Sequence, residues 1–417
     1  MTIRKSFQAW FVVLVGALFF FYAFFQVNMM GPLNQYISQA FKADASQVGL
    51  LSAFYFYANI IFMLPAGLLL DRFPVRKLFL FNMLLVIAGT LIFASSTNLA
   101  MASFARFLCG IMMAFGLVSC LKLASQLLPP ERMALASSLI VTIGMVGGIF
   151  SHLPMERMIT AFGWRGALIG VSFIGLFILL ILWGIVKVPP QKVTPPPTSM
   201  NVWKSLFVAL KRPQNWYCGL FTCFLNLPVA ILGALFGITY LTQVYMLDPT
   251  MAASITSMLF FGMIFGSPFF GWLSDFMKKR KLPMFLGAIF CLLFMMIILY
   301  VGHIHISALY FLFFAVGFTS GSQVLGYPVI SETNPPHLTG TALSLAAILI
   351  MGIGYGLGLP FVGKLLDVFG TGKVEGGVHI YANAAYQKAF FTIPIGIIIS
   401  MIMVALIKET NCKQAQR

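Results

Sequence analysis

Long apolar runs, separated by short polar stretches, repeat along the whole chain. Each run has about 20 residues, the length that a helix needs to cross roughly 30 Å of hydrocarbon. The pattern predicts an all-α membrane protein with twelve transmembrane helices. The predicted spans are residues 9–30, 46–68, 78–97, 99–121, 137–160, 165–187, 215–242, 250–273, 283–302, 306–330, 338–363 and 386–407.

The composition and charge agree with a bilayer and set the topology. Hydrophobic residues make up 60% of the chain and charged residues only 9%, against about a quarter in soluble proteins. With both termini on one side, 18 of the 26 Lys and Arg lie in the terminal segments and even-numbered connections, and six on the other side. The positive-inside rule therefore predicts that both termini are cytoplasmic. The net charge of +16 reports this topology and gives no support for nucleic-acid binding.

Several landmarks occur twice, in the same order and at nearly constant spacing. Gly67 and Asp71 recur 204 residues later, and Pro129-Pro130, Gly148 and Pro154 recur 206 residues later as Pro335-Pro336, Gly354 and Pro360. This repeat predicts two six-helix bundles in the same orientation, a known transporter plan. We assign residues 1–188 to the N-terminal bundle, 189–213 to a proline-rich cytoplasmic linker with a short amphipathic helix at 201–211, and 214–417 to the C-terminal bundle.

The stretch around the first of these landmarks resembles a family signature. Gly67-x3-Asp71-Arg72 with Arg76 and Lys77 is similar to the loop between the second and third helices of the major facilitator superfamily, although Pro74-Val75 replaces a single glycine. Arg106-x3-Gly110, Pro129-Pro130-Glu131-Arg132 and Gly163-Trp164-Arg165 resemble further family landmarks. The resemblance covers the whole chain. It implies a secondary carrier with its site near the membrane midplane between two halves, working by rocker-switch alternating access.

Within that superfamily, three motifs resemble the bacterial phagosomal transporters, which carry amino acids and nucleosides. They are Phe21-Tyr22-x-Phe24, Asn226-Leu227-Pro228 and Gly266-Ser267-Pro268. The match extends to organic-anion and siderophore carriers, which stay open as alternatives. The glycine–proline motif of drug/proton antiporters is missing from the fifth helix, GMVGGIFSHLP, so drug efflux is a weaker alternative. The resemblance implies a location in the bacterial inner membrane.

Polar side chains within the spans are the candidates for substrate binding, since each costs free energy in hydrocarbon unless it faces protein or water. Tyr22 and Gln26 share a face of the first helix because they are four residues apart. An interhelical hydrogen bond that only holds helices together is an equal alternative for Gln26. The first, fourth, seventh and tenth helices line the cavity in the family. The remaining candidates are Asn226, Gln323 and Tyr327, with Tyr55, Asn59 and Tyr355 as weaker ones.

Arg106 lies within the fourth span, where an uncompensated charge is costly. The fourth and fifth helices turn near residue 131, and Arg106 and Glu156 are each 25 residues from that point, so they should reach similar depth. His152 is one turn from Glu156 and titrates near neutral pH. We therefore predict an Arg106–Glu156–His152 cluster for proton coupling, with Arg106 also able to hold a substrate carboxylate. The alternative is that Glu156 is a surface charge at a helix end.

Two cytoplasmic loops are predicted to gate the carrier. Asp71 would accept hydrogen bonds from the N-terminus of the eleventh helix near Leu338 to Thr341, where the helix dipole favours negative charge, and Asp275 would face the fifth helix. The bases after Asp71 would hold the loop in the cytoplasm. The candidate gating residues are Gly67, Asp71, Arg72, Arg76, Lys77, Glu131, Arg132, Gly271 and Asp275.

The residues expected for enzymatic or ATP-driven chemistry are missing. The sequence has no P-loop, no GxSxG motif and no metal-ligand spacing, so we expect no enzyme activity, no cofactor and no metal. The sequence favours a monomeric carrier that takes up a small polar organic solute, an amino acid first, with protons. A solute sensor that does not transport is a further alternative. Two intact gating loops argue against it.

Overall fold

The computed structural model describes residues 3–129, 132–187, 207–302, 304–375 and 378–412. The chain divides into two compact units, one formed by Met1–Ala43 and Leu50–Thr194, the other by Asp44–Gly49 and Pro195–Arg417. Most of the predicted linker, including much of the amphipathic helix expected at 201–211, lies outside the described residues.

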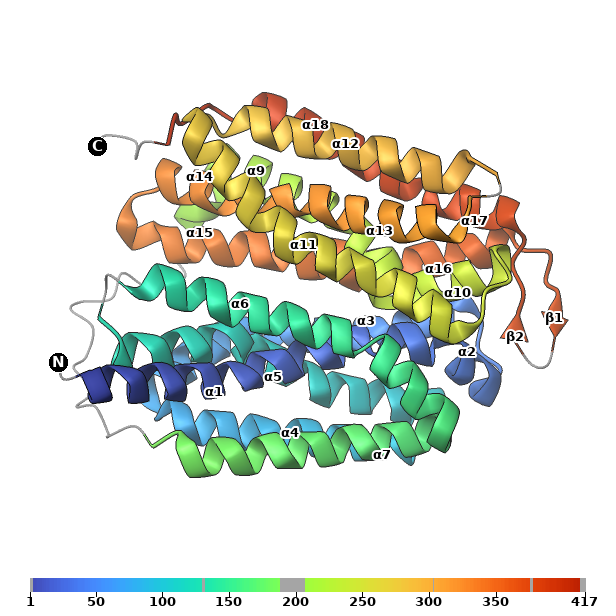
Figure 1. The fold of residues 1–417 in the computed structure, drawn as a ribbon, viewed down its shortest axis with the longest axis horizontal. Coiled ribbons are helices and arrows are strands. Elements are labelled where there is room, and N and C mark those ends of the chain that lie inside the picture. Colours follow the sequence, from blue (N-terminus) through green and yellow to red (C-terminus); the bar gives the residue numbers. More distant parts are fainter. Residues whose placement is uncertain (1–2, 130–131, 188–206, 303, 376–377, 413–417) are drawn as a thin grey trace. The chain divides into compact units, whose positions relative to one another are not determined.

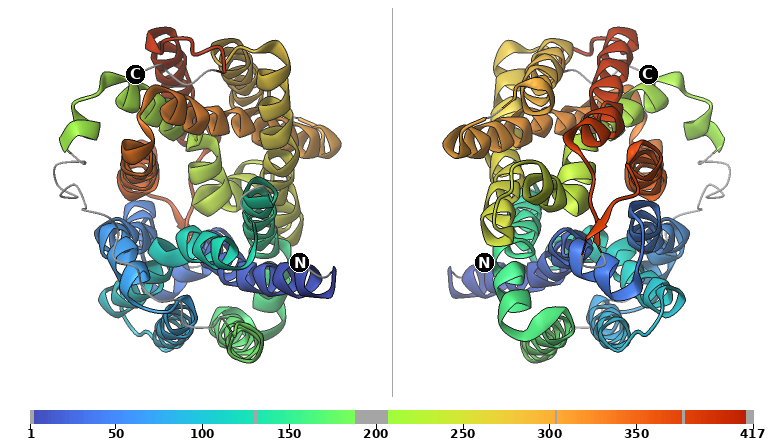
Figure 2. Two further views of the ribbon diagram at one scale, coloured as in Figure 1. Left: turned by 90° about the vertical axis from the view of Figure 1, so that its left-hand side faces the viewer. Right: turned by 90° about the vertical axis from the view of Figure 1, so that its right-hand side faces the viewer.

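The first unit is a bundle of long helices, drawn from blue to green in Figure 1 and seen end-on in Figure 2. Its helices are α1 (Ile3–Asn28), α2 (Met30–Phe41), α3 (Ala45–Arg72), α4 (Val75–Ala94), α5 (Leu99–Leu127), α6 (Met133–Phe150) and α7 (Leu153–Ile185). Helix α3 begins in the six residues that belong to the second unit and continues in the first.

The second unit is also helical, with three segments that leave α-helical geometry. Its helices are α9 (Pro213–Leu225), α10 (Gly237–Val244), α11 (Pro249–Met277), α12 (Lys281–Tyr300), α13 (Ile306–Ser320), α14 (Gly326–Thr333), α15 (Pro336–Leu349), α16 (Gly358–Phe369), α17 (Asn383–Phe390) and α18 (Thr392–Leu406). Val229–Phe236 and Ile350–Leu357 are π-helical, and Gly321–Leu325 is a 3₁₀ turn. Two short strands, β1 (Val374–Glu375) and β2 (Val378–His379), pair antiparallel.

The described helices account for the twelve predicted spans. Ten helical stretches are long and apolar enough to cross a membrane, and the pair Pro213–Leu225 and Val229–Val244, bent by 43°, makes an eleventh. One stretch, Leu135–Ile185, has 51 residues, or about 75 Å of helix at 1.5 Å per residue, more than twice the bilayer core. It therefore holds two crossings. The chain breaks between them, first near Ser151 and again at Gly163, whose φ of 71° suits only glycine well.

The connection after the first span contains a helix that the apolar pattern does not predict. Helix α2 follows α1 after Met29 and ends at Lys42, a residue in the left-handed conformation. Its apolar and small residues Met30, Gly31, Pro32, Leu33 and Ile37 are buried. The helix was missed because its polar residues interrupt the run, so the segment resembles an ordinary outer loop.

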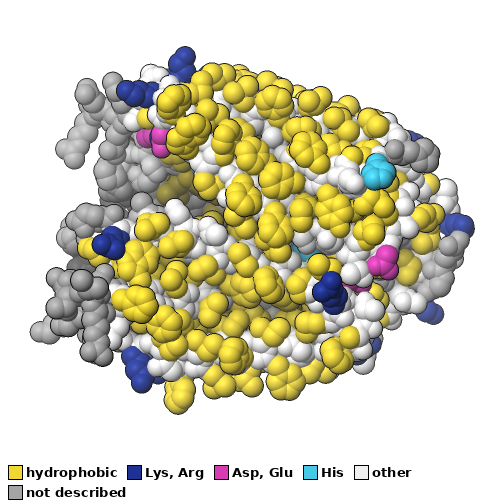
Figure 3. Space-filling view, in the orientation of Figure 1, with side chains coloured by type: hydrophobic (Ala, Val, Ile, Leu, Met, Phe, Trp, Pro, Cys, Tyr) yellow, Lys and Arg dark blue, Asp and Glu magenta, His cyan; other side chains and the backbone are white. Residues whose placement is uncertain are grey.

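Apolar side chains face outward along the helices of both units, as bilayer-spanning helices require. Phe173 on α7 and Phe276 on α11 are among the most exposed, at 66% and 73%. Figure 3 shows hydrophobic side chains over most of the face in view, with Lys, Arg, Asp and Glu gathered mainly toward its ends. The buried polar residues lie inside the units instead, and they form the candidate site.

Glycines set the closest helix contact in the second unit. A Cβ at Gly262 of α11 would lie 2.1 Å from the carbonyl oxygen of Phe314, and one at Gly317 of α13 would lie 2.0 Å from that of Leu259. Gly266 makes the same approach to Phe318, at 2.0 Å. This contact between backbones is the small-residue packing of membrane helices.

Replacing Gly262 with alanine should therefore destabilise the second unit. The added Cβ would meet backbone rather than a flexible side chain, and overpacking of this kind costs about 1–3 kcal/mol. Thermal unfolding of the detergent-purified protein should show a lower midpoint than the parent. Gly271→Ala is the control in the same helix, since no atom lies within 4 Å of its added Cβ. Equal midpoints for the two variants would contradict the packing argument.

Candidate functional site

A fully buried arginine stands at the centre of the first unit. Arg106 of α5 has 0% exposure, and its Nη1 donates a hydrogen bond of 2.9 Å to the backbone carbonyl of Gln26. Its guanidinium carbon lies 4.6 Å from the centroid of the Tyr55 ring. A carbonyl oxygen and an aromatic face both stabilise a cation without neutralising it.

The carbonyl of Gln26 is free to accept this bond because of where α1 ends. The last four carbonyls of a helix have no partner within it, and α1 ends at Asn28. The Tyr55 ring reaches the guanidinium because α3 and α5 approach closely. A Cβ at Gly110 would lie only 2.0 Å from the Tyr55 carbonyl. Gly110, one turn after Arg106, thus lets the two helices meet.

Four predicted site residues of the first unit form one connected cluster. Gln26 donates from Nε2 to the Thr90 hydroxyl at 2.9 Å, and the Tyr55 hydroxyl donates to the Ala23 carbonyl at 3.1 Å. The Tyr22 hydroxyl donates to the Val171 carbonyl at 3.0 Å. Gln26 therefore makes the interhelical hydrogen bond that the sequence left as an alternative. The sequence did not single out Thr90, although a threonine within an apolar span was a usable signal.

Several buried polar atoms in this cluster have no hydrogen-bond partner among the described residues. They are the Nε and Nη2 of Arg106, the Oε1 of Gln26 and the Oδ1 of Asn59. Asn59 is 2% exposed and lies one turn from Tyr55 on the same face of α3. Unsatisfied buried groups are rare in proteins and are concentrated where function requires them. The cluster thus presents two donors on one guanidinium, with acceptors on two neighbouring helices.

A second polar cluster lies within the second unit, where the helices depart from α geometry. Gln323 donates from Nε2 to the Oδ1 of Asn226 at 3.1 Å, and Asn226 donates from Nδ2 to the Tyr355 hydroxyl at 3.3 Å. Asn226 ends α9 just before Pro228 and a π-helical segment, and Tyr355 lies within the other π-helical segment. Such distortions often occur at functional sites.

Hydrogen bonds in this second cluster join Asn226, Gln323 and Tyr355, three of the four binding-site candidates of the second unit. Tyr327 lies one turn after Gln323, with no side-chain hydrogen bond to the other three among the residues the structure describes.

The predicted proton-coupling residues are buried, but they are not joined to Arg106. Glu156 has 0% exposure and accepts a hydrogen bond of 2.9 Å from the Tyr36 hydroxyl of α2. The His152 Nδ1 lies 2.9 Å from the Gly148 carbonyl. No ion pair links Arg106 to Glu156 within the described chain. The equal distances of Arg106 and Glu156 from the turn predicted only that they lie at similar depth. The helix breaks after Phe150, and Tyr36 of α2, a helix that the sequence did not predict, contacts Glu156 instead.

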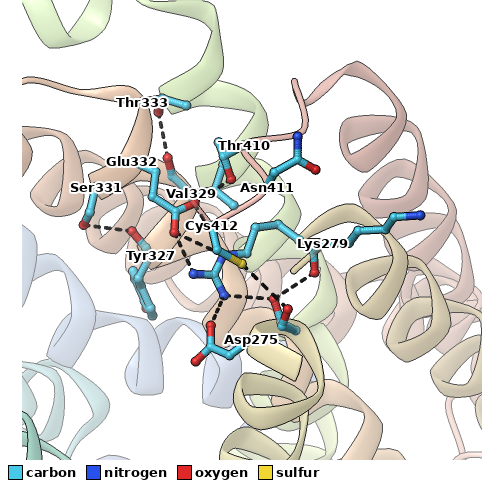
Figure 4. Close-up of polar contacts among 12 residues, drawn as sticks. Asp275, Lys279, Tyr327, Val329, Ser331, Glu332, Thr333, Thr410, Asn411 and Cys412 are labelled. Carbon is cyan, nitrogen blue, oxygen red and sulfur yellow. Dashed lines mark hydrogen bonds and ion pairs between the residues drawn. The ribbon is translucent and has the colours of Figure 1, made fainter. Parts of the chain in front are cut away.

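The second gating loop contains an ion network, shown in Figure 4. Arg280 donates from Nη1 to Asp275 at 2.7 Å and from Nη2 to Glu332 of α14 at 2.6 Å. The Arg280 side chain is 9% exposed, whereas that of Asp275 is 70% exposed. Asp275 is therefore bound by the arginine that follows it in its own loop. Its expected approach to the fifth helix stays a prediction.

Residues after the last helix complete this network. Both carboxylate oxygens of Glu409 accept hydrogen bonds from α12, from the N–H groups of Arg280 at 2.8 Å and Lys281 at 2.9 Å. The Thr410 hydroxyl donates to Glu332, and Figure 4 shows both side chains together. The N-terminus of α12, where the dipole favours negative charge, is thus capped from the far end of the chain. Spacing in the sequence gives no signal for this contact.

The first gating loop is described in part. Arg76 donates to the Trp183 carbonyl at 2.5 Å, while Arg72, Lys77 and Arg132 are exposed. A Cβ would meet nothing within 4 Å at Gly67, as at Gly271. The side chain of Asp71 and all of Glu131 lie outside the described residues, so their roles stay predictions.

Comparison with known proteins decides the family. The model of the Major Facilitator Superfamily matches residues 16–245 and, a second time, residues 218–414. The chain belongs to the Major Facilitator Superfamily. The twelve-helix, two-repeat fold that the sequence predicts for a member of this superfamily is thereby confirmed.

Similar proteins include transporters of organic acids. The sialic acid transporter NanX of Escherichia coli is 24% identical over 381 residues, covering 87% of this chain and 88% of NanX. The 4-hydroxybenzoate transporter PcaK of Pseudomonas putida is 32% identical over 184 residues, 42% of this chain and 39% of PcaK. Matches to the other superfamily relatives cover as little as 36% of their length.

The fold of this superfamily member also matches a solved structure. A bacterial homologue of the human lysosomal transporter Spinster, in an inward-facing and occupied conformation, superposes with a TM-score of 0.78 at 17% identity. The alignment covers 95% of each chain.

The cap on α12 predicts a pH dependence of stability in this protein. Partial burial acts to raise the pKa of Glu409, but hydrogen bonds from four backbone N–H groups outweigh it and hold the pKa below its ordinary value. The stabilisation is therefore present above the unfolded pKa, about 4.3, and is lost as pH falls through the folded pKa. Glu409→Gln should unfold at lower temperature than the parent at pH 7, and the difference should shrink below about pH 4. A difference that grows on acidification would contradict this sign.

Proposed function

We propose that the protein takes up a small solute bearing a carboxylate, an amino acid first, together with protons, across the bacterial inner membrane. The observation that carries this proposal is the buried guanidinium of Arg106, whose Nε and Nη2 have no hydrogen-bond partner among the described residues. These two donors point from the same edge of a planar group. Their geometry matches the two oxygens of a carboxylate, which arginine binds through two parallel hydrogen bonds.

Two buried acceptors of the first unit favour an amino acid over a simple anion. Gln26 and Asn59 each offer a buried oxygen without a hydrogen-bond partner in the described chain. An ammonium group would donate to such oxygens, while a solute carrying only a carboxylate would leave them unsatisfied, at a cost of about 1–3 kcal/mol. The second cluster, with Asn226, Gln323 and Tyr355, offers neutral groups suited to a polar solute.

An organic-anion carrier is the second candidate, and two of the relatives support it. The two described above are named for 4-hydroxybenzoate and for sialic acid, and both solutes are acids. Either substrate class would use Arg106 in the same way. Siderophore transport, drug efflux and a sensing role without transport have no comparable support from the described side chains.

The transport cycle would use the gating loops and a titrating carboxylate. In a rocker-switch cycle, Asp71 and Asp275 would take part in closing the cytoplasmic side, with Gly67, Arg72, Arg76, Lys77, Glu131, Arg132 and Gly271 in the same loops. Glu156 is the candidate proton carrier, because its carboxyl is fully buried and accepts a hydrogen bond from the Tyr36 hydroxyl. His152, one turn away, would assist it. We expect a monomer with both termini in the cytoplasm.

Arg106→Lys should weaken carboxylate binding although it keeps the charge. Lysine is a point charge without the two-donor edge, and losing a charge-assisted pair should weaken binding about tenfold or more. The measurement is thermal stabilisation of the purified protein by a panel of amino acids and organic acids, since a ligand that binds the native state raises its stability. Arg157→Lys is the matched control at an exposed position. Parent-like stabilisation of Arg106→Lys would overturn the proposal.

Glu156→Gln should uncouple transport from protons. Glutamine keeps the shape and can still accept from Tyr36, but it cannot titrate. In proteoliposomes loaded with the solute that the panel identifies, exchange across the membrane should persist, whereas accumulation driven by a pH gradient should be lost. Asp248→Asn, which removes an exposed carboxylate, should retain both. Gradient-driven accumulation by Glu156→Gln equal to that of the parent would remove Glu156 from the mechanism.

A further inference from the structure

The side-chain amide of Gln26 is held in one orientation by Thr90. The Thr90 hydroxyl donates its proton to the Val86 carbonyl at 2.7 Å, one turn back in α4, a common bond for threonine in a helix. With its proton committed, this oxygen can only accept from Gln26. The Nε2 of Gln26, at 2.9 Å, therefore faces Thr90, and the opposite orientation would bring two acceptors together.

The thiol of Cys109, which is close to Thr90, does not replace Gln26 as the hydrogen-bond donor to the Thr90 hydroxyl. The Cys109 Sγ lies 3.7 Å from the Val86 carbonyl, to which its proton is directed, and 3.8 Å from the Thr90 hydroxyl. Thr90 and Cys109 both have exposures of 0%. The amide of Gln26 is consequently set by protein groups alone.

Fixing the amide nitrogen fixes the oxygen. The Oε1 of Gln26 turns away from Thr90 and has no hydrogen-bond partner in the described part of the chain. The backbone carbonyl of the same residue holds the Nη1 of Arg106. One residue therefore anchors the guanidinium through its main chain and presents an acceptor through its side chain. A ligand with a carboxylate and a hydrogen-bond donor close to it would use both groups.

We propose that Thr90 is a positioning residue that, by fixing the Gln26 amide, makes the transporter select 2-amino and 2-hydroxy acids over carboxylates without a donor. This inference rests on the proposed function, because it assumes that Arg106 binds the carboxylate. Without the Thr90 hydroxyl the amide is free to turn over. Its NH₂ group would then face the ligand, where it repels an ammonium and offers nothing to a hydroxyl that needs an acceptor.

The test compares two sets of acids that differ only at the second carbon. The probes are alanine, lactate and propionate, and the larger set phenylalanine, phenyllactate and phenylpropionate. Affinities come from thermal stabilisation of the purified full-length protein. In the parent, the amino and hydroxy acids of the set that binds should be preferred over the unsubstituted acid by about tenfold, the equivalent of one hydrogen bond to a buried group.

Thr90→Val should reduce this preference severalfold, and Thr90→Ser, which keeps the hydroxyl, should restore it. The ratio of the affinities for substituted and unsubstituted acids, measured on one sample, does not depend on the folded fraction. A destabilised variant can therefore still be compared with the parent. Thr142→Val is the matched control, since Thr142 makes the same bond to the carbonyl one turn back but is exposed on α6.

The outcomes separate this inference from the proposed function. If Arg106→Lys removes binding while Thr90→Val keeps the parent ratio, the role of Thr90 is refuted and carboxylate binding stands. A parent that binds propionate or phenylpropionate as tightly as the substituted acids also refutes it. If no acid of either set binds, or if Arg106→Lys has no effect, the proposed function itself fails.

Discussion

A positive charge buried without a counter-ion among the described residues is the constraint on which the first unit depends. Arg106 is fully buried in an apolar bundle, where an uncompensated charge is expensive. The chain meets this cost with partial charges: a carbonyl released by the end of α1 and the face of an aromatic ring. Each of these two contacts depends on a local feature of the sequence. Helix α1 must stop near Gln26, and α5 must carry a glycine where it meets Tyr55.

A carboxylate partner would satisfy Arg106 more completely, and none contacts it among the residues that the structure describes. The buried acid of this unit, Glu156, is bound by Tyr36 instead. A full ion pair would occupy the guanidinium edge that remains without a partner. Leaving buried donors unsatisfied costs stability, and proteins accept such costs at functional sites. The proposed carboxylate ligand would satisfy these donors.

The sequence predicted those features that follow from periodicity along one helix or from the repeat. Apolar runs gave the spans because bilayer thickness fixes their length, and a spacing of four residues placed Tyr22 and Gln26 on one face. Polar residues in spans of the C-terminal half led to Asn226 and Gln323, which do meet. Contacts that depend on the rotation of one helix against another were not predictable. Distance from a turn gave the depth of Glu156 but not the direction in which it points, and nothing in the local pattern links Thr90 to Gln26 or Glu409 to α12.

The two units stabilise their buried polar groups in different ways. In the first unit the polar atoms surround a charge, and the α-helical backbone of α3, α4 and α5 holds them in place. In the second unit the amides of Asn226 and Gln323 satisfy each other, beside a proline and two π-helical segments. Proline removes a backbone donor, and a π-helical turn shifts the hydrogen-bond register, so fewer regular α-helical hydrogen bonds hold the backbone there. A rigid, charged cluster is suited to recognising a ligand, whereas a neutral cluster on a deformable backbone is suited to changing shape around one. Under the proposed function, the first repeat would thus recognise the ligand and the second would adapt to it.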